Sequence, residues 1–200
     1  DSKAIFNGGR ICDIETGQTL VEFDSKFYSN CWVSALSSDG KMAACTSDDR
    51  HRVGDHQIIL ANVSTGESIH TLNAEEAYPP GLEYFLINSL AFSPDGKILA
   101  SIDSRSKIIL WDVNPGSLIS SFDPISEETG LRTDEIDYSH RLTGTEALIA
   151  FSPDGKMLAA GYAFGSIIFW DVATARPIYV IKADIPSSIE SLVFSADGKM

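Results

Sequence analysis

The chain of 200 residues is 44% hydrophobic and 22% charged, proportions typical of a globular protein and not of a disordered one. Its 15 basic and 28 acidic residues give a net charge of -13, which argues against a direct nucleic-acid partner, because binding to DNA or RNA needs a basic surface. No apolar run approaches the roughly 20 residues of a membrane-spanning helix, so we expect no insertion into a membrane.

The three cysteines, Cys12, Cys31 and Cys45, are an odd number and show no CxxC spacing. This argues against a disulfide framework and against a structural zinc site. We therefore expect three small, buried and reduced side chains. The first residues, DSKAIFNGG, lack the basic and apolar regions of a signal peptide, so we expect an intracellular and most simply a cytoplasmic protein.

A unit repeats along the chain, and Asp-Gly turns mark its period. The turn residues Asp39, Asp95, Asp154 and Asp197 follow one another at intervals of 56, 59 and 43 residues. The two most similar copies read SLAFSPDGKILA and ALIAFSPDGKMLAA. In chain order we expect the last three strands of a unit over residues 1–23, complete units over residues 31–72, 87–122 and 140–181, and the first strand of another over residues 188–200.

Each complete unit is predicted to form four short strands. Apolar residues alternate before a Ser-Pro-Asp-Gly turn, in which Pro94 fixes φ and Gly96 tolerates a positive φ. A Leu-Ala stretch and an Ile-Ile-Leu-Trp run supply the second and third strands. A second turn, which has Gly116 in one copy and Ala175 in another, leads to the fourth strand. No segment has the apolar period of an amphipathic helix, so helices should be scarce.

These motifs resemble those of the WD-repeat (tryptophan–aspartate repeat) β-propeller family. The resemblance rests on Trp111-Asp112 and Trp170-Asp171, which follow the turns Asp95-Gly96 and Asp154-Gly155. It implies an all-β fold of four-stranded antiparallel blades around a central channel. The chain would hold three complete blades and two partial ones, as a segment of a ring of about seven blades. The alternative is that its two ends share one blade and close a ring of about four.

The chain departs from the family in one respect. The family commonly has a Gly-His pair, whose histidine joins a Ser or Thr, an Asp and the Trp in a buried hydrogen-bond network. No Gly-His dipeptide occurs here. His140 lies near the expected place in the last complete unit, but Tyr162 and Ala163 stand where its hydroxyl and carboxylate partners would lie. We therefore expect no complete network and a fold stabilised by apolar packing.

Three inserts, at Asp48–His56, Asn73–Asn88 and Asp123–Glu146, lengthen joints that should all lie on one rim of the blades. Their net charges of -1, -3 and -5 account for -9 of the total of -13. Loops on a rigid scaffold often carry binding residues, and an acidic rim would steer a basic partner toward it. The alternative is that these acids are merely solvated and keep the protein soluble.

Aromatic residues in the inserts favour a binding rim, because aromatic anchors are typical of interface hot spots. The alternative is that these rings fold back onto the propeller. The residues that we expect to contact a partner are Tyr78, Glu83, Glu127, Glu128, Arg132, Asp134, Glu135, Tyr138 and His140.

The sequence contains no GxSxG, HExxH or P-loop motif, and the polar cluster over residues 48–56 fixes no metal geometry. We therefore expect no catalytic residue, no metal and no cofactor. The WD-repeat resemblance implies a non-catalytic scaffold that binds other proteins, with a basic surface as the favoured partner type. The alternative is a sensing or recruiting domain of a larger enzyme or signalling protein, and a propeller hydrolase is a third, less favoured hypothesis.

Overall fold

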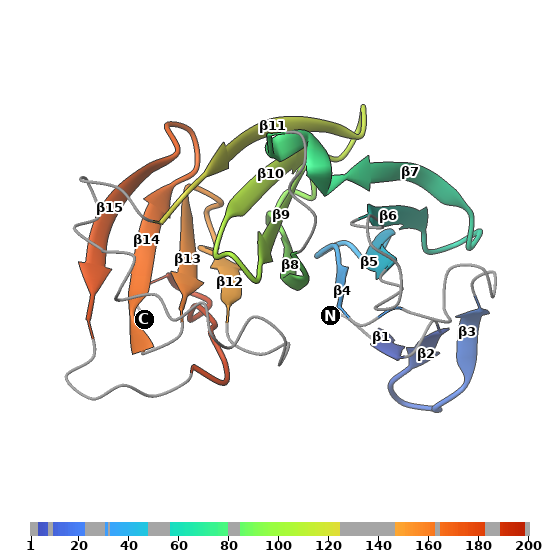
Figure 1. Cartoon of the computed structure of the whole chain (residues 1–200). Helices are drawn as coiled ribbons and strands as arrows, with labels where there is room; N and C mark the ends of the chain where they lie inside the picture. The colour runs from blue at the N-terminus through green and yellow to red at the C-terminus, as the bar shows by residue number, and fades with distance from the viewer. Residues whose placement is uncertain are drawn as a thin grey trace.

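The computed structural model describes residues 4–7, 10–22, 31, 33–47, 57–79, 85–124, 147–162, 165–182 and 189–198. Within this part of the chain the fold is all-β, and four antiparallel sheets stand side by side in an arc (Figure 1). We number these sheets blades 1 to 4 in chain order. The expected fold class, the antiparallel blades of a β-propeller, is confirmed.

Blade 1 has three strands and blades 2, 3 and 4 have four each, with neighbours in sequence paired in the sheet. A single turn of 3-10 helix, η1 (Ala74–Ala77), follows blade 2, and no helix of the described residues could cross a membrane. The strands are β1 (Ala4–Asn7), β2 (Arg10–Asp13) and β3 (Thr19–Glu22) in blade 1; β4 (Ser34–Leu36), β5 (Met42–Ser47), β6 (Gln57–Asn62) and β7 (Ser68–Asn73) in blade 2; β8 (Ile87–Phe92), β9 (Ile98–Asp103), β10 (Ile108–Asp112) and β11 (Ser117–Phe122) in blade 3; and β12 (Leu148–Phe151), β13 (Met157–Gly161), β14 (Ile167–Asp171) and β15 (Arg176–Ile181) in blade 4.

Inner strands are buried on successive residues because both faces of each sheet are covered. In β10 every residue from Ile108 to Trp111 is buried. Ile109 and Trp111 belong to the apolar cluster between blades 2 and 3, whereas Ile108 and Leu110 belong to the cluster between blades 3 and 4. Since successive side chains of a strand point to opposite faces, one strand contributes to two cores. Each of these large side chains stabilises the fold by about 2 kcal/mol through burial.

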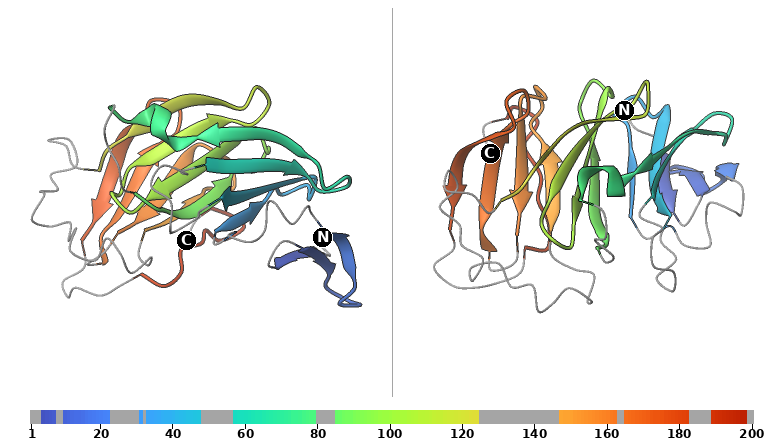
Figure 2. Two further views of the ribbon diagram at one scale, coloured as in Figure 1. Left: turned by 45° about the vertical axis from the view of Figure 1, so that its right-hand side comes forward. Right: turned by 45° about the horizontal axis from the view of Figure 1, so that its top comes forward.

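The arc is open, with blade 1 at one end and blade 4 at the other (Figures 1 and 2). Residues 189–198, expected to begin a further blade, form a turn like the others, in which Gly198 N donates to the Ser195 carbonyl at 2.9 Å. They lie along blade 4, where the ring centroid of Phe194 is 6.1 Å from that of Phe169. A strand ladder needs a neighbour for its hydrogen bonds, and within the described residues none pairs with this segment.

The expectation of three reduced cysteines is wrong. Cys31, just before β4, and Cys45, in β5, form a disulfide, and their Cα atoms are 5.7 Å apart. Cys12 is a free cysteine. An odd count leaves room for one bridge and one thiol, and the spacing in the sequence does not show which positions two adjacent segments bring together.

Candidate protein-interaction surface

Short turns between the first and second strands form one rim of the arc, and a repeated hydrogen-bond pattern closes them. In blade 3, Ser93 Oγ donates to Asp95 Oδ1 at 2.7 Å, and Lys97 N donates to the same oxygen at 3.1 Å. The Ser–Asp contact recurs in the other three turns at 2.6 or 2.7 Å. The Ser93 hydroxyl, followed by the Lys97 amide, lowers the pKa of Asp95. The pKa values of Asp39 and Asp154 are lowered as well, so these three carboxylates act as ionised turn caps at neutral pH.

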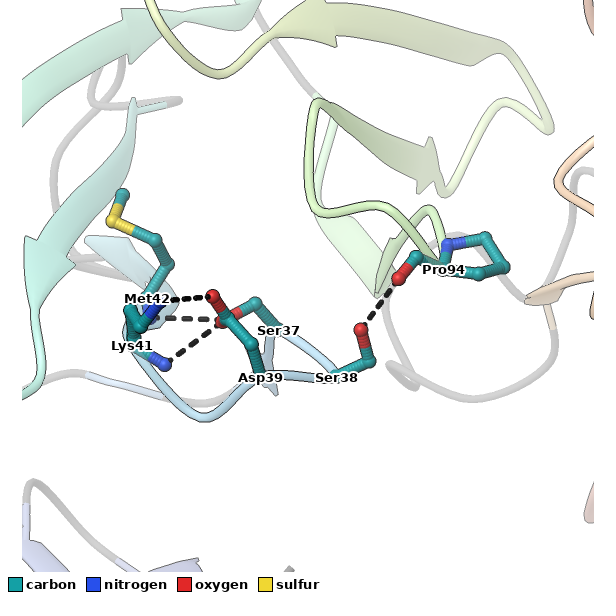
Figure 3. Close-up of polar contacts among 6 residues, drawn as sticks. All are labelled: Ser37, Ser38, Asp39, Lys41, Met42 and Pro94. Atoms are coloured by element: carbon teal, nitrogen blue, oxygen red, sulfur yellow. Dashed lines mark hydrogen bonds and ion pairs between the residues drawn. The ribbon is translucent and has the colours of Figure 1, made fainter.

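Neighbouring turns also contact each other across the boundary between blades (Figure 3). Ser38 Oγ in blade 2 donates to the carbonyl oxygen of Pro94 in blade 3 at 2.5 Å. Pro94 in turn lies against blade 4, because a Cβ placed on Gly155 would be 3.4 Å from Pro94 Cδ. The Asp95-Gly96 and Asp154-Gly155 motifs are thus part of the framework of this rim.

The aspartate of each Trp-Asp pair caps the second turn of its blade. Asp171 Oδ1 accepts hydrogen bonds from Thr174 N at 2.8 Å and from Thr174 Oγ1 at 2.7 Å. The Thr174 hydroxyl contributes most to lowering the pKa of the Asp171 carboxyl. Asp112 Oδ1 accepts from Asn114 N at 3.1 Å, and Asn62 caps the equivalent turn of blade 2 with its amide oxygen. These residues therefore stabilise the turns of their blades.

Blade 3 contains two buried polar contacts, and no histidine takes part in them. The sequence predicted that the family's network would be incomplete. Trp111 Nε1 donates to Ser101 Oγ at 3.0 Å, and both residues are buried. Asp103 is 1% exposed, and its Oδ2 accepts a hydrogen bond from the hydroxyl of Tyr78. Burial raises the pKa of Asp103 to about 7. The contact between Tyr78 and Asp103 was not predicted from the sequence, because a histidine was the expected partner, whereas a tyrosine from the preceding insert supplies the polar group.

Within its described residues, blade 4 has no such network. The pairing of β13 with β14 places Ala160 at the hydroxyl position and Tyr162 at the carboxylate position, so the positions assigned to Tyr162 and Ala163 from the sequence are wrong. The Tyr162 hydroxyl and the Trp170 Nε1 are buried, and neither has a hydrogen-bond partner among the described residues. Burial raises the pKa of Tyr162. Apolar packing holds these two side chains, as the sequence predicted.

Of the three inserts, the structure describes residues 73–79, 85–88, 123 and 124. Tyr78 is half-buried, its ring centroid lies 4.6 Å from that of Phe85, and Lys107 Nζ is 4.9 Å from the Tyr78 centroid. Within the described residues no cluster of His, Cys, Asp and Glu could hold a metal ion. The polar cluster over residues 48–56 lies outside the described residues, as do the other contact candidates, Glu83, Glu127, Glu128, Arg132, Asp134, Glu135, Tyr138 and His140.

A pocket of about 260 Å³ lies between blades 2 and 3 on the rim of short turns. Its lining combines apolar Met42, Ile69 and Val113 with the charged groups of Asp95 and Lys97. The volume falls just below the range of about 300 to 1,000 Å³ that small-molecule sites occupy. The pocket suits a single side chain of a partner better than a whole ligand.

WD-repeat propellers are built from four-stranded antiparallel sheets set side by side, with a Trp-Asp pair before the last turn of a sheet. Blades 3 and 4 have both features. The family model described as WD domain, G-beta repeat matches residues 66–112. The matched repeat runs from the second turn of blade 2 to β10 of blade 3, and the described sheets have the architecture of WD-repeat propeller blades. Domains of this family generally bind other proteins and have no catalytic activity of their own.

Curated relatives include proteins that are much longer than this chain. Apoptotic protease-activating factor 1 of Rattus norvegicus is 27% identical over 168 residues, which are 84% of this chain and 11% of that protein. The human protein of the same name is 39% identical over 86 residues, 43% of this chain and 6% of that protein. The guanine nucleotide-binding protein subunit beta of Oryza sativa subsp. japonica is 26% identical, with 96% of this chain and 47% of that protein covered. The chain thus spans about a tenth of the rat relative and about half of the rice relative.

Proposed function

We propose that this chain is a non-catalytic scaffold that binds a partner protein with a basic surface through the rim that carries its inserts. The observation that carries the proposal is the charge distribution, since the three inserts hold -9 of the net charge of -13. A concentrated negative potential raises the rate at which a basic partner encounters the rim and orients it on approach.

The described ends of the insert at Asn73–Asn88 support this proposal, because hydrogen bonds hold one end at the close of blade 2 and the other against blade 3. Asn73 Oδ1 accepts a hydrogen bond from Glu75 N at 3.1 Å at the start of η1. At the other end, Leu86 N donates to Ser104 Oγ at 3.0 Å, and Ser104 N donates to the Leu86 carbonyl at 2.7 Å. Loops with fixed ends lose less entropy when they bind, which favours their use as contact surfaces.

The proposal is tested by removing charge from the rim without changing its shape. The double variant Glu127→Gln, Glu128→Gln should weaken binding to a panel of lysine- and arginine-rich peptides by about three- to tenfold, since each rim charge contributes at most about 1 kcal/mol. The measurement is fluorescence anisotropy of labelled peptides at several salt concentrations. Binding of the unaltered chain should weaken as the salt concentration rises.

A matched control removes the same charge from the other rim. Glu15 and Glu67 lie in the second turns of blades 1 and 2, and both are exposed. The variant Glu15→Gln, Glu67→Gln should bind the peptides as the unaltered chain does. Equal weakening by both double variants would show that net charge alone attracts the peptides, and the assignment of the partner surface to the insert rim would then be abandoned.

A second candidate function is that of a sensing or recruiting domain in a larger enzyme or signalling protein. The observation that favours it is the match to 11% of a relative named for protease activation. The intact mass of the native polypeptide, measured from its source, tests this candidate. A mass near 21.7 kDa would contradict it, whereas a much larger mass would support it and direct attention to the additional domains.

A further inference from the structure

The disulfide between Cys31 and Cys45 reinforces the face of blade 2 that is turned toward blade 1. Ala43 belongs to the apolar cluster between blades 1 and 2, whereas Ala44 belongs to the cluster between blades 2 and 3. Since successive side chains of a strand point to opposite faces, Cys45 shares the face of Ala43. The bridge is therefore a covalent bond on the blade 1 side of β5.

The apolar cluster between blades 1 and 2 is small. Among the described residues it has three buried members, against eleven in the cluster between blades 2 and 3. The strand register explains the difference. In blade 2, Ala61 pairs with Ala43, and in blade 3 the equivalent pair joins Trp111 to Leu99. Blade 2 thus has an alanine where blade 3 has its tryptophan, so burial of apolar surface stabilises this boundary less.

Cys45 occupies the register position of the serine that binds this tryptophan. It pairs with Ile59 of β6, and in blade 3 the equivalent pair joins Ser101 to Ile109. Ser101 Oγ accepts the hydrogen bond of Trp111 Nε1. At the position where blade 3 has a Trp–Ser hydrogen bond, blade 2 therefore has one half of a disulfide.

Other contacts hold the start of β4 to β5 independently of the bridge. Thr46 N donates to the Val33 carbonyl at 3.0 Å, and Val33 N donates to Thr46 Oγ1 at 3.2 Å. The strand pairing then continues from Ser34, which is opposite Cys45. Opening the disulfide would remove one constraint from this end of the blade and leave the pairing of β4 with β5 in place.

The two bridged cysteines differ in exposure. Cys45 is 7% exposed, whereas Cys31 is half-buried. A disulfide is opened by a thiolate that must reach one of the two sulfur atoms, and access decides which sulfur it attacks. The incoming thiolate would therefore attack Cys31 Sγ and displace Cys45.

We propose that Cys31 and Cys45 form a reversible thiol–disulfide site, which exchanges with small thiols of the glutathione class and, when reduced, loosens the boundary between blades 1 and 2. A glutathione thiolate attacks Cys31 Sγ, a mixed disulfide forms, and Cys45 leaves as a thiolate. A second glutathione thiolate attacks the glutathione sulfur of the mixed disulfide and releases Cys31. Two thiols are thus oxidised to one disulfide while the bridge is reduced, and their two protons pass to the cysteines.

Exchange under native conditions tests the chemistry. The whole chain is equilibrated without denaturant in excess reduced glutathione and then transferred to oxidised glutathione. Free thiols are trapped with iodoacetamide and located by peptide mass mapping. Labels at Cys31 and Cys45 should appear in the first buffer and disappear in the second. A bridge that opens only after unfolding in urea would overturn the proposal, and so would two cysteines that remain labelled in oxidised glutathione.

Amide hydrogen exchange measures the consequence for the fold. Protection at Val33 and Thr46 should fall about 10- to 100-fold on reduction, because the bridge closes a loop of 14 residues and its loss restores conformational entropy. Protection at Ile11, which is buried at the boundary in blade 1, should fall with them. The reference is Val172 N, which donates to the Lys156 carbonyl in blade 4. Unchanged protection at the first three amides would overturn the proposal, and so would an equal fall at Val172.

Two variants assign the effect to this pair of cysteines. Cys31→Ser removes the bridge, so it should have the low protection of the reduced chain in both buffers. The matched control is Cys12→Ser, which removes the free thiol and keeps the bridge, so the response to glutathione should remain. A response that persists in Cys31→Ser, or that disappears in Cys12→Ser, would refute the site. If Cys31→Ser does not fold, the unaltered chain in its two redox states decides.

Discussion

Replacement of Gly116 by alanine should destabilise the chain more than the same change at any exposed turn. Gly116 lies in the second turn of blade 3 with a φ of +67°, where an added Cβ would be 2.5 Å from His70 Cγ and 2.8 Å from His70 Cβ. The left-handed backbone costs alanine about 1 kcal/mol. The imidazole must also move, which breaks its 2.6 Å contact with the Asn114 carbonyl oxygen at a cost of about 1 kcal/mol. Repacking adds to this, for a total of about 2 to 4 kcal/mol.

The matched control is Gly40→Ala in the first turn of blade 2. Gly40 has nearly the same φ, +69°, but a Cβ added there would have no neighbouring atom within 4 Å. Only the backbone cost of about 1 kcal/mol should appear. Urea unfolding of both variants beside the unaltered chain, followed by tryptophan fluorescence, measures the difference. Equal losses for the two variants would refute the argument that blades 2 and 3 meet tightly at His70.

Three further substitutions test the polar and backbone features of the blades. Ala175 has a φ of 56° where the other second turns have glycine, so Ala175→Gly should raise the free energy of unfolding by about 0.5 to 1 kcal/mol. Ser101→Ala leaves the buried Trp111 N–H without its acceptor and should lower the free energy of unfolding by about 1 to 3 kcal/mol. In the described residues the Trp170 N–H has no hydrogen-bond partner, and Ala160→Ser offers it an acceptor. This substitution should raise the free energy of unfolding by about 1 kcal/mol. Urea unfolding measures all three, and an unchanged midpoint in any of them contradicts its rationale.

The fold could be predicted from the sequence because its determinants are local. The Ser93–Asp95 and Asp171–Thr174 hydrogen bonds join residues two and three apart, so a short motif that recurs along the chain produces the same kind of turn each time. Buried inner strands are recognised in the sequence as continuous apolar runs, such as the one that ends at Trp111. The positions of the strands follow once these turns are recognised.

The contact between Tyr78 and Asp103 and the disulfide could not be predicted, because each depends on residues that only the folded chain brings together. Tyr78 and Asp103 are 25 residues apart, and no motif links a tyrosine in an insert to an aspartate at a strand end. Cys31 and Cys45 are 14 residues apart on neighbouring segments. The candidate binding residues are harder still to predict from the sequence. Their assignment rests on charge and loop length, which constrain the positions of side chains weakly.

The division of β10 between two apolar clusters has a consequence for cooperativity. In the part of the chain that the structure describes, blade 3 has no core of its own, because each cluster is completed by the sheet next to it. Stability is then a sum of nearest-neighbour terms along a row, as in other repeat proteins. A destabilising change in one blade should lower the stability of its two neighbours and have little effect on the blades beyond them. The terminal sheets, which have one neighbour instead of two among the described residues, should be the first to unfold.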